Sequence, residues 1–284
     1  MPIDYETLRH FPIPEIRQHW AARDTILYAL SIGLGQNPLD PRQLDFVDQH
    51  RVLKAVPSMV VVLGSPGFWL ADPKTTADAV QLVHGEQGFV IHRPLPAAGD
   101  IIGRTRIAGL IDKGAGRAAL LYTEKEVIDG ATGALIATTT STTFLRGQGG
   151  FGGPAGPLKE VHRIPVGPPE ITCDLPTRPE QALYYRLNGD DNPLHADPAV
   201  AARAGFPRPI LHGLCTLGVV CHALLAALAD YDTARLTALD LRFSAPVFPG
   251  ETLRAEIWRN GAFQARALER DTLVITNGRV VITP

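Results

Sequence analysis

A run rich in glycine and proline divides this chain of 284 residues into two parts. The run covers residues 147–169 and contains Gly147-Gln-Gly-Gly-Phe-Gly-Gly-Pro-Ala-Gly-Pro157 and Gly167-Pro-Pro169. Glycine and proline at this density continue neither a helix nor a central strand, so the run is predicted to be a linker. The parts that it separates, 1–146 and 170–284, each have an ordinary domain size.

The two parts share one sequence pattern. Tyr28-Ala-Leu-Ser-Ile-Gly-Leu-Gly-Gln-Asn-Pro-Leu-Asp40 in the first part resembles Tyr185-Arg-Leu-Asn-Gly-Asp-Asp-Asn-Pro-Leu-His195 in the second. A very apolar helix candidate follows each segment, at residues 58–63 and 214–228. This repetition indicates a duplicated unit.

Turns and strands follow in the same order in both parts. Proline–glycine turns are predicted at residues 93–100 and 245–251. Strand-like runs close the parts, at 101–102, 118–122 and 134–145 in the first and at 253–258, 263–268 and 273–282 in the second. A buried helix followed by several alternating strands predicts an α+β unit, in which an antiparallel sheet wraps around the helix.

The composition is that of a globular protein, with 45% hydrophobic and 20% charged residues. The net charge of −2 provides no broad basic field, so nucleic acid is not expected as a partner. The three cysteines are too few and too irregularly spaced for a disulfide framework, which favours a reducing compartment. No uncharged apolar stretch reaches the ~18 residues typical of a membrane span, so stable membrane insertion is not expected.

Targeting signals are not recognised at either end of the sequence. Met1-Pro-Ile-Asp-Tyr-Glu6 lacks the basic and apolar segments of a signal peptide. Val281-Ile-Thr-Pro284 carries no recognisable peroxisomal address. The expected location is therefore cytoplasmic. In a eukaryote it would be peroxisomal, although no C-terminal peroxisomal signal is seen.

Helix signals frame the segment Asn188–His195. Asp197-Pro198 is a helix N-cap followed by proline at the first helical position, and Gly205 is a suitable stop for that helix. Asn188–His195 is therefore predicted to be a turn between two helical pieces. Loops held on a rigid scaffold are common positions for catalytic residues.

Asp190 and His195 in this turn have two possible roles. A carboxylate and an imidazole that face one water supply general acid and base catalysis. Alternatively, Asp190 caps the turn and His195 satisfies a backbone group, since such residues commonly form turns. Aligning Asn37-Pro-Leu39 with Asn192-Pro-Leu194 places Gly35 opposite Asp190 and Asp40 opposite His195. The turn thus occurs in both parts and the acid–imidazole pair in one only, which favours catalysis.

His212-Gly213 precedes the apolar helix candidate of the second part. A glycine at a helix start allows close approach of a substrate, and the free N–H groups there stabilise negative charge on a carbonyl oxygen. A tight turn without a ligand is the alternative. The first part has Pro57-Ser58 at the corresponding place and lacks this glycine.

Two other motifs match known sites only by their letters. Gly147-x-Gly149-x-x-Gly152 has the spacing of a dinucleotide fingerprint, but a proline-rich segment follows it instead of a helix. His212, Cys215, Cys221 and His222 do not have a zinc spacing and lie on or beside an apolar helix candidate. Core packing is predicted for these four, and no metal is expected.

The central sequence closely resembles that of the (R)-specific enoyl-CoA hydratases, also called MaoC-like dehydratases or hydratase 2. The resemblance is strongest over Tyr185–Pro198 and Ala204–Thr216, where Asn188 replaces the usual serine. Other segments resemble the hydratase 2 portion of peroxisomal multifunctional enzyme type 2, namely 23–30, 84–87, 112–116, 149–153 and 243–250. The resemblance thus extends over nearly the whole chain.

The resemblance implies a double hot-dog fold, with a sheet wrapped around a long helix in each part. It implies that Asp190 and His195 hold and activate water, that Asn192 supports them, and that Gly213 donates its N–H to the thioester oxygen. The positions that match the substrate site are His84, Gly85, Lys113, Asp191, Pro193, Leu194 and Phe243. It also implies an acyl-CoA substrate, no cofactor and a homodimer.

The expected activity is reversible hydration of trans-2-enoyl-CoA to (3R)-3-hydroxyacyl-CoA. Residues 170–284 are expected to form the catalytic repeat, and residues 1–146 a non-catalytic repeat that binds the acyl chain. Two alternatives remain from the residues themselves. A hot-dog thioesterase would direct water onto the carbonyl carbon, and an acyl-CoA-binding protein would show no turnover.

Overall fold

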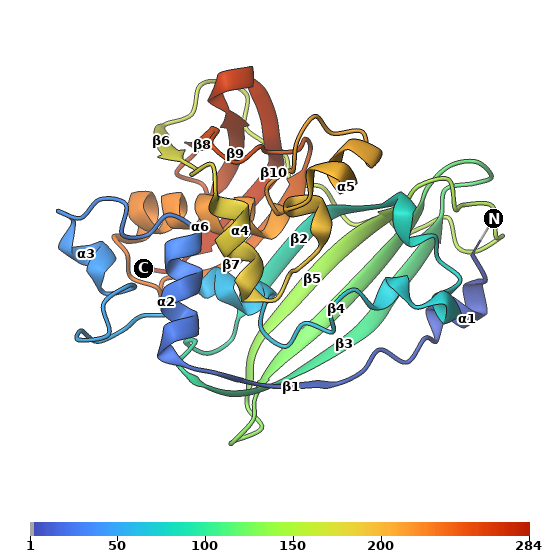
Figure 1. The fold of residues 1–284 in the computed structure, drawn as a ribbon, viewed down its shortest axis with the longest axis horizontal. Coiled ribbons are helices and arrows are strands. Elements are labelled where there is room, and N and C mark those ends of the chain that lie inside the picture. Colours follow the sequence, from blue (N-terminus) through green and yellow to red (C-terminus); the bar gives the residue numbers. More distant parts are fainter. Residues whose placement is uncertain (1–2) are drawn as a thin grey trace.

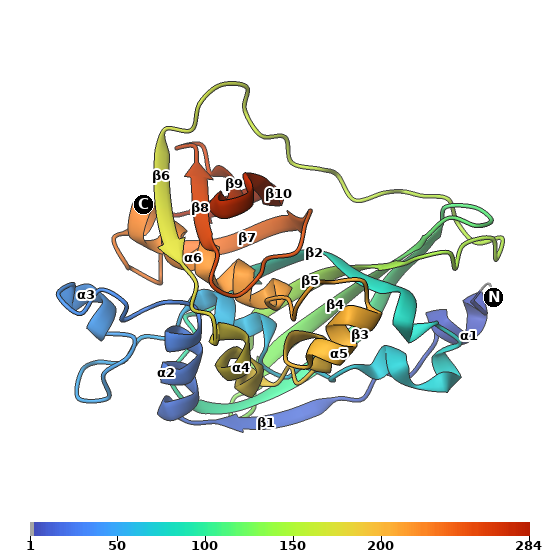
Figure 2. The same ribbon diagram turned by 45° about the horizontal axis from the view of Figure 1, so that its top comes forward.

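Ten strands form one antiparallel sheet in the order β1-β3-β4-β5-β2-β7-β10-β9-β8-β6 (Figures 1 and 2). The structure is a computed structural model that describes residues 3–284, so Met1 and Pro2 of the predicted first part lie outside the described residues. The strands of the first half are β1 (Ile16–Trp20), β2 (Leu82–Ile91), β3 (Gly99–Asp112), β4 (Ala119–Asp129) and β5 (Leu135–Leu145). Those of the second half are β6 (Ile171–Pro176), β7 (Leu236–Phe243), β8 (Thr252–Ile257), β9 (Ala262–Ala267) and β10 (Thr272–Ile282).

The sheet shows the duplication that the sequence predicts. From the outer edge to the middle, the first half runs β1-β3-β4-β5-β2 and the second runs β6-β8-β9-β10-β7, so corresponding strands take corresponding places. The halves join where β2 pairs with β7, with Gly88 opposite Asp240. The predicted strands near β3–β5 and β8–β10 are confirmed, and both proline–glycine turns lie between strands. Sequence patterns missed β1, β2, β6 and β7.

The chain has one long helix, α6, and several short ones. The α-helices are α1 (Tyr5–Arg9), α2 (Ala22–Ser31), α3 (Pro41–Leu44), α4 (Gln181–Tyr185), α5 (Pro198–Arg203) and α6 (Gly213–Ala229). The 3-10 helices are η1 (Pro57–Val61), η2 (Trp69–Ala71), η3 (Pro73–Thr75), η4 (Ala79–Gln81), η5 (Arg186–Asn188), η6 (Pro193–His195) and η7 (Leu268–Arg270). Helix α6 is apolar on nearly all sides and contacts β6, β7, β8 and β10, as a core helix should. No helix in residues 3–284 is long and apolar enough to cross a membrane.

The first half does not contain the long helix that was expected there. The apolar segment at 58–63 forms only the five-residue 3-10 helix η1. The run Val60-Val61-Val62 is β-branched and has low helix propensity, and Gly64 (φ 61°) and Pro66 then end the segment. Helix α6 also contains Val219-Val220, but Leu and Ala, which favour a helix, make up most of its second half.

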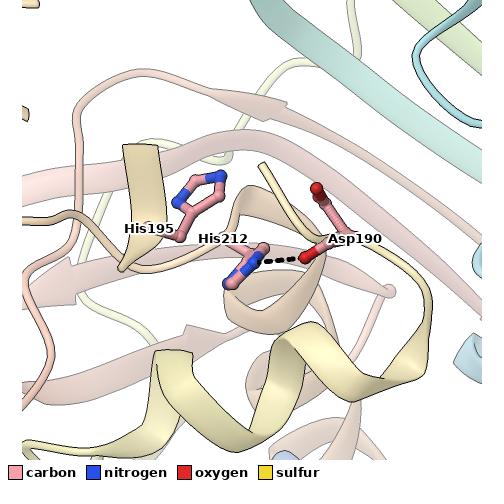
Figure 3. Close-up of side chains that lie close together, drawn as sticks. All are labelled: Asp190, His195 and His212. Atoms are coloured by element: carbon pink, nitrogen blue, oxygen red, sulfur yellow. Dashed lines mark hydrogen bonds between the residues drawn. The ribbon is translucent and has the colours of Figure 1, made fainter. Parts of the chain in front are cut away.

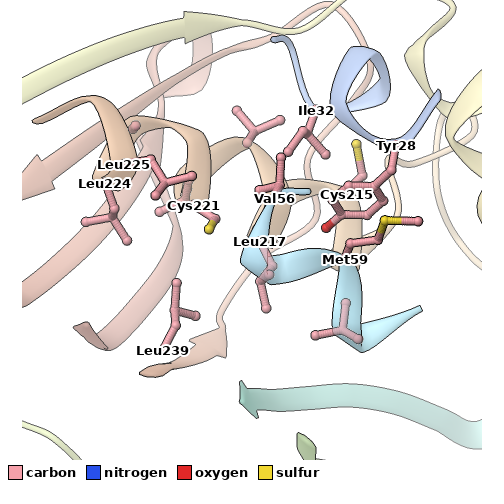
Figure 4. Close-up of a cluster of buried hydrophobic side chains, with 14 of the residues drawn as sticks. Tyr28, Ile32, Val56, Met59, Cys215, Leu217, Cys221, Leu224, Leu225 and Leu239 are labelled. Atoms are coloured by element: carbon pink, nitrogen blue, oxygen red, sulfur yellow. The ribbon is translucent and has the colours of Figure 1, made fainter. Parts of the chain in front are cut away.

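The main hydrophobic core is shared by both halves (Figure 4). Tyr28, Ile32 and Met59 from the first half pack with residues of α6 and β7 from the second, among them Cys215, Leu217, Cys221, Leu224 and Leu239. Cys215 and Cys221 are fully buried free thiols, so the predicted core packing of these two is confirmed. Because the core crosses the boundary between the halves, each half stabilises the other.

The glycine-rich segment after β5 has neither helix nor strand until β6, and it runs outside the sheet (Figure 2). Its beginning is fixed to the loop between β3 and β4 by Asp112. This buried carboxylate accepts backbone N–H groups of Gly150 and Gly152 at 2.8 Å and of Gly114 at 2.7 Å. These hydrogen bonds, that from Gly150 above all, lower the pKa of Asp112 and keep it ionised.

Candidate active site

The loop between α4 and α5 takes its shape from two residues. Gly189 has a φ of 107° and ends η5, a conformation that favours glycine. Asn192 caps η6, because its Oδ1 accepts the N–H of Leu194 at 3.0 Å. Asn37 makes the same contact to Leu39 at 3.2 Å in the first half, which supports the alignment of the two turns. Asn192 therefore shapes the loop that carries Asp190 and His195.

His195 is held so that one ring nitrogen remains free. Its ring is buried, with 8% of the residue exposed, and Nδ1 lies 2.9 Å from the carbonyl oxygen of Ile210. A carbonyl only accepts, so Nδ1 carries the proton and Nε2 has the lone pair. Burial lowers the pKa of His195, while the Ile210 carbonyl and Asp190 oppose this shift. The ring is therefore neutral near pH 7, as a general base must be.

Asp190 lies beside His195 (Figure 3). A carboxylate oxygen of Asp190 and one ring nitrogen each of His195 and His212 all lie within 4.8 Å of one another. Asp190 is partly exposed, and its Oδ1 accepts the N–H of Asn192 at 3.3 Å. The structure thus brings a carboxylate and a neutral imidazole together at a place that solvent can reach.

His212 belongs to the same cluster, which sequence reasoning missed by assigning it to core packing alone. It has 0% exposure, its ring stacks on that of His195 with centroids 3.8 Å apart, and its Nε2 lies 3.1 Å from the backbone oxygen of Asp190 (Figure 3). Burial and the neighbouring His195 lower its pKa to about 3. A neutral His212 therefore supports both members of the pair without adding charge. Its position next to Gly213 was the available signal.

Hydrogen bonds fix the protons on the two histidines of this cluster. The Nε2 of His212 faces a backbone oxygen and donates its proton there, so its lone pair is on Nδ1, which has no hydrogen-bond partner among the described residues. His195 is protonated on Nδ1 and has its lone pair on Nε2. These fixed donor and acceptor roles suit acid–base chemistry.

Gly213 is the first residue of α6, and its N–H lies ahead of the helical hydrogen bonds. The first of these joins the N–H of Thr216 to the oxygen of His212 at 3.0 Å, so the N–H groups before Thr216 are not used within the helix. A Cβ on Gly213 would lie 3.3 Å from the ring of Phe243. This glycine therefore combines a free donor with close packing under an aromatic ring.

Phe243 joins Gly213 to His84. The rings of Phe243 and His84 meet edge to face with centroids 5.1 Å apart. The Nε2 of His84 lies 3.1 Å from the Oγ of Ser141, and burial lowers the pKa of His84 despite the opposing effects of Gln87, Glu86 and Asp190. His84, Phe243 and Gly213 thus form one continuous side of the site that reaches from β2 to α6.

The other expected substrate residues take separate positions. Gly85 lies at a bulge between β2 and β5, where a Cβ would come within 2.1 Å of Phe144, so packing explains this glycine. Lys113 lines a cavity of about 220 Å³ together with Arg117, Lys159 and Arg242. Among the described residues, no hydrogen bond or ion pair joins Lys113 to Asp190 or His195. In the loop between α4 and α5, Asp191 and Pro193 are exposed and Leu194 is half-buried.

The buried histidines predict a loss of stability in mild acid. Burial lowers the pKa of His212 to about 3 and that of His222 to about 4, from 6.5. The unfolded chain therefore binds these protons first, so stability is complete above about pH 6.5 and falls as the pH decreases toward these values. At pH 5, above the usual carboxyl range, each ring should cost about 2 kcal/mol.

Urea unfolding at pH 8 and pH 5 measures this loss. His222→Gln removes one titrating ring, which lies 3.1 Å from the Tyr231 hydroxyl in the core, and should make the difference between the two pH values smaller. The remaining difference comes from His212, His195 and His84, whose pKa values burial also lowers. Equal urea midpoints for the parent protein at both pH values would contradict the assignment of neutral buried rings.

Comparison with known proteins places the chain in a family. Residues 161–279 match the MaoC like domain, and residues 19–147 match the MFE-2 hydratase 2 N-terminal domain. The 3-hydroxyacyl-thioester dehydratase Y of Mycobacterium tuberculosis is 44% identical, over 84% of this chain and 82% of that protein. The peroxisomal enoyl-CoA hydratase 2 of Arabidopsis thaliana is 39% identical, over 93% and 90% respectively.

A solved structure agrees over both halves. The MaoC-like dehydratase of Phytophthora capsici aligns with a TM-score of 0.85 and 32% identity, covering 99% of this chain and 98% of that chain. The chain belongs to the MaoC-like dehydratase family, in the branch that also carries the hydratase 2 N-terminal domain. The expected α+β double hot-dog fold is confirmed, with η1 in place of a long helix in the first half.

Proposed function

We propose that this protein catalyses the reversible hydration of trans-2-enoyl-CoA to (3R)-3-hydroxyacyl-CoA, and is thus a hydro-lyase. The observation that carries the proposal is the meeting of Asp190 and the neutral His195 near the free N–H groups of α6. The names of the relatives, an enoyl-CoA hydratase and a hydroxyacyl-thioester dehydratase, support the two directions of one reaction.

The residues have complementary roles in this reaction. Asp190 and the Nε2 of His195 orient one water and take its proton as the oxygen bonds to C3 of the substrate. The electron pair of the C2–C3 double bond moves toward the thioester, and its oxygen becomes an enolate oxygen that the N–H of Gly213 stabilises. One member of the pair then delivers a proton to C2. The sum is addition of one water, in a syn sense, and dehydration is the reverse.

The first half has no such acid–base pair at its equivalent turn. Asp40, opposite His195, caps α3 and forms an ion pair with Arg42 at 2.8 Å, and Gly35 stands opposite Asp190. Both features support a structural role for this turn. We therefore propose that residues 1–146 contribute acyl-chain space while residues 170–284 carry out the chemistry, with residues 147–169 as the connection.

The direct test is hydration by the purified protein. A panel of trans-2-enoyl-CoAs of increasing chain length, followed by loss of the enoyl absorbance and by chiral analysis, should give the (3R)-hydroxy product. The reaction transfers protons and no electrons, so added nicotinamide should have no effect, and we expect EDTA to leave turnover unchanged. Release of free CoA from saturated acyl-CoA would instead indicate a thioesterase. Tight binding without turnover on any chain length would indicate an acyl-CoA-binding protein.

Two further properties belong to this proposal. We propose a homodimer, which the family resemblance supports and which light scattering of the purified protein would test. We also propose a cytoplasmic location, which fractionation of the source cells would test. A monomeric mass or a membrane-bound fraction would contradict the corresponding property.

A further inference from the structure

One serine of the non-catalytic half contacts three elements of the catalytic half. Ser31 is the last residue of α2 and has 0% exposure. Its backbone oxygen accepts a hydrogen bond from the Nε2 of Gln181, in α4, at 3.0 Å. The Sγ of Cys215, in the first turn of α6, donates to the same oxygen at 3.4 Å. Gln181 and Cys215 are also fully buried, so these contacts are not shared with solvent.

The side chain of Ser31 makes the third contact. Its Oγ accepts a hydrogen bond from the Nδ2 of Asn188 at 3.0 Å and donates one to the backbone oxygen of Tyr28 at 2.7 Å. The same Nδ2 of Asn188 donates to the backbone oxygen of Tyr185 at 2.8 Å. Asn188 therefore connects the end of α2 to the end of α4 through its amide group.

These contacts lie next to the two groups that the proposed reaction uses. Asn188 precedes Asp190 by two residues, with the left-handed Gly189 between them. Cys215 follows Gly213 by two residues in the first turn of α6. The end of α2 thus contacts both Asn188, just before Asp190, and the first turn of α6, which begins at Gly213.

We propose that Ser31 is a positioning residue for hydration, which fixes the Asp190 loop relative to the start of α6 from outside the catalytic half. This inference rests on the proposed function. Its physical basis is that buried hydrogen bonds are costly to leave unmade. The loop that begins at Asn188 and the start of α6 are therefore held in one geometry. A displacement of about 1 Å at a catalytic group can reduce turnover by ~10²-fold. The non-catalytic half then contributes to kcat as well as to substrate binding.

Ser31→Ala tests the side-chain contact of Ser31 without removing its backbone contacts. It removes the Oγ that accepts from Asn188, while the backbone oxygen keeps its contacts with Gln181 and Cys215. The amide of Asn188 also keeps its bond to Tyr185, and alanine favours a helix, so the fold should persist. We expect kcat to fall by roughly 10- to 100-fold, as for a small displacement of Asp190, with little change in KM.

Ser58→Ala is the matched control. Ser58 is also a fully buried serine of the first half, and its Oγ accepts from the Tyr28 hydroxyl at 2.9 Å without contacting the catalytic loop. The same atom is removed, so a similar change in thermal midpoint is expected with kcat unchanged. Equal losses of kcat in Ser31→Ala and Ser58→Ala would overturn the positioning role, because both would then report general destabilisation.

Asn188→Ala tests the same contact from the other side. It should lower kcat at least as much as Ser31→Ala does, because it removes the bond to Tyr185 as well as the bond to Ser31. The double variant should lose no more than Asn188→Ala alone, because the Ser31–Asn188 contact is already absent there. Independent losses that multiply would overturn the inference. Failure of the parent protein to hydrate any enoyl-CoA would overturn the proposed function instead. An active parent with a fully active Ser31→Ala variant would overturn only the role of Ser31.

Discussion

Asp190→Asn and His195→Gln are each expected to lower the turnover of trans-2-enoyl-CoA by about 10²–10⁴-fold, the usual contribution of a positioned acid or base. Asparagine keeps the size of Asp190 and can still accept the N–H of residue 192, but it is not basic. Glutamine places a polar amide near the position of Nε2, but it does not exchange a proton near neutral pH. Both substitutions are therefore expected to retain polarity in the loop and to remove the proposed acid and base.

The controls for this pair come from the chain itself. Asp40→Asn changes an acidic residue at the equivalent turn of the first half and should leave turnover nearly unchanged. The double variant of Asp190 and His195 should lose far less than the product of the two single losses, because both residues act on one water. Binding of a saturated acyl-CoA should survive in each variant. Normal turnover by either folded single variant would show that the pair only shapes the loop.

Gly213→Pro should lower turnover by about two to three powers of ten, which corresponds to the ~2.7–4 kcal/mol typical of one lost donor to an enolate or oxyanion. The backbone accepts proline at this position for two reasons. Gly213 is the first helical residue, where proline is favoured, and His212 has φ −57° and ψ 136°, the conformation preferred before proline. Loss of turnover should therefore reflect the missing N–H more than a disrupted helix.

Gly213→Ala is the matched variant for this test. It adds a Cβ that would lie 3.3 Å from the Phe243 ring, as proline does, but it retains the N–H. The difference in turnover between the alanine and proline variants isolates the donor from the crowding. Circular dichroism should show the same helix content in both. Equal turnover by the two variants would eliminate the proposed contact between the Gly213 N–H and the enolate.

Much of the loop that carries Asp190 and His195 could be predicted from the sequence because its structure is local. The cap at Asp197, the stop at Gly205 and the turn at Asn192 each depend on residues two or three positions away. The same holds for strands β3–β5 and β8–β10, in which apolar and polar residues alternate. The position of His195 next to Asp190 follows from the closed turn between them.

The rest of the site depends on contacts between distant segments. Ser31 meets Asn188 across 157 residues, and His195 donates to Ile210 across a helix and a turn, so no local pattern contains them. Strand β2 was missed because the bulge at Gly85 interrupts its alternation. The long helix predicted in the first half failed for a different reason. The apolar residues at 58–63 correctly indicate that the segment is buried. They do not indicate its length, and the β-branched run of valines limits the helix to five residues.

The seam between β2 and β7 places both copies of the repeat within one polypeptide. In a symmetric pair of identical subunits, every substitution appears on both sides of the interface at once. Here a substitution changes only one of the two halves. The side of the site formed by the first half can therefore differ in sequence from the side formed by the second half. One side has the seventeen-residue helix α6 and the acid–imidazole pair. The other has the five-residue helix η1 and, at the equivalent turn, a glycine and a capping aspartate. A substitution in residues 1–146 that spares the contact of Ser31 with Asn188 therefore changes the side formed by the first half while Asp190 and His195 stay as they are.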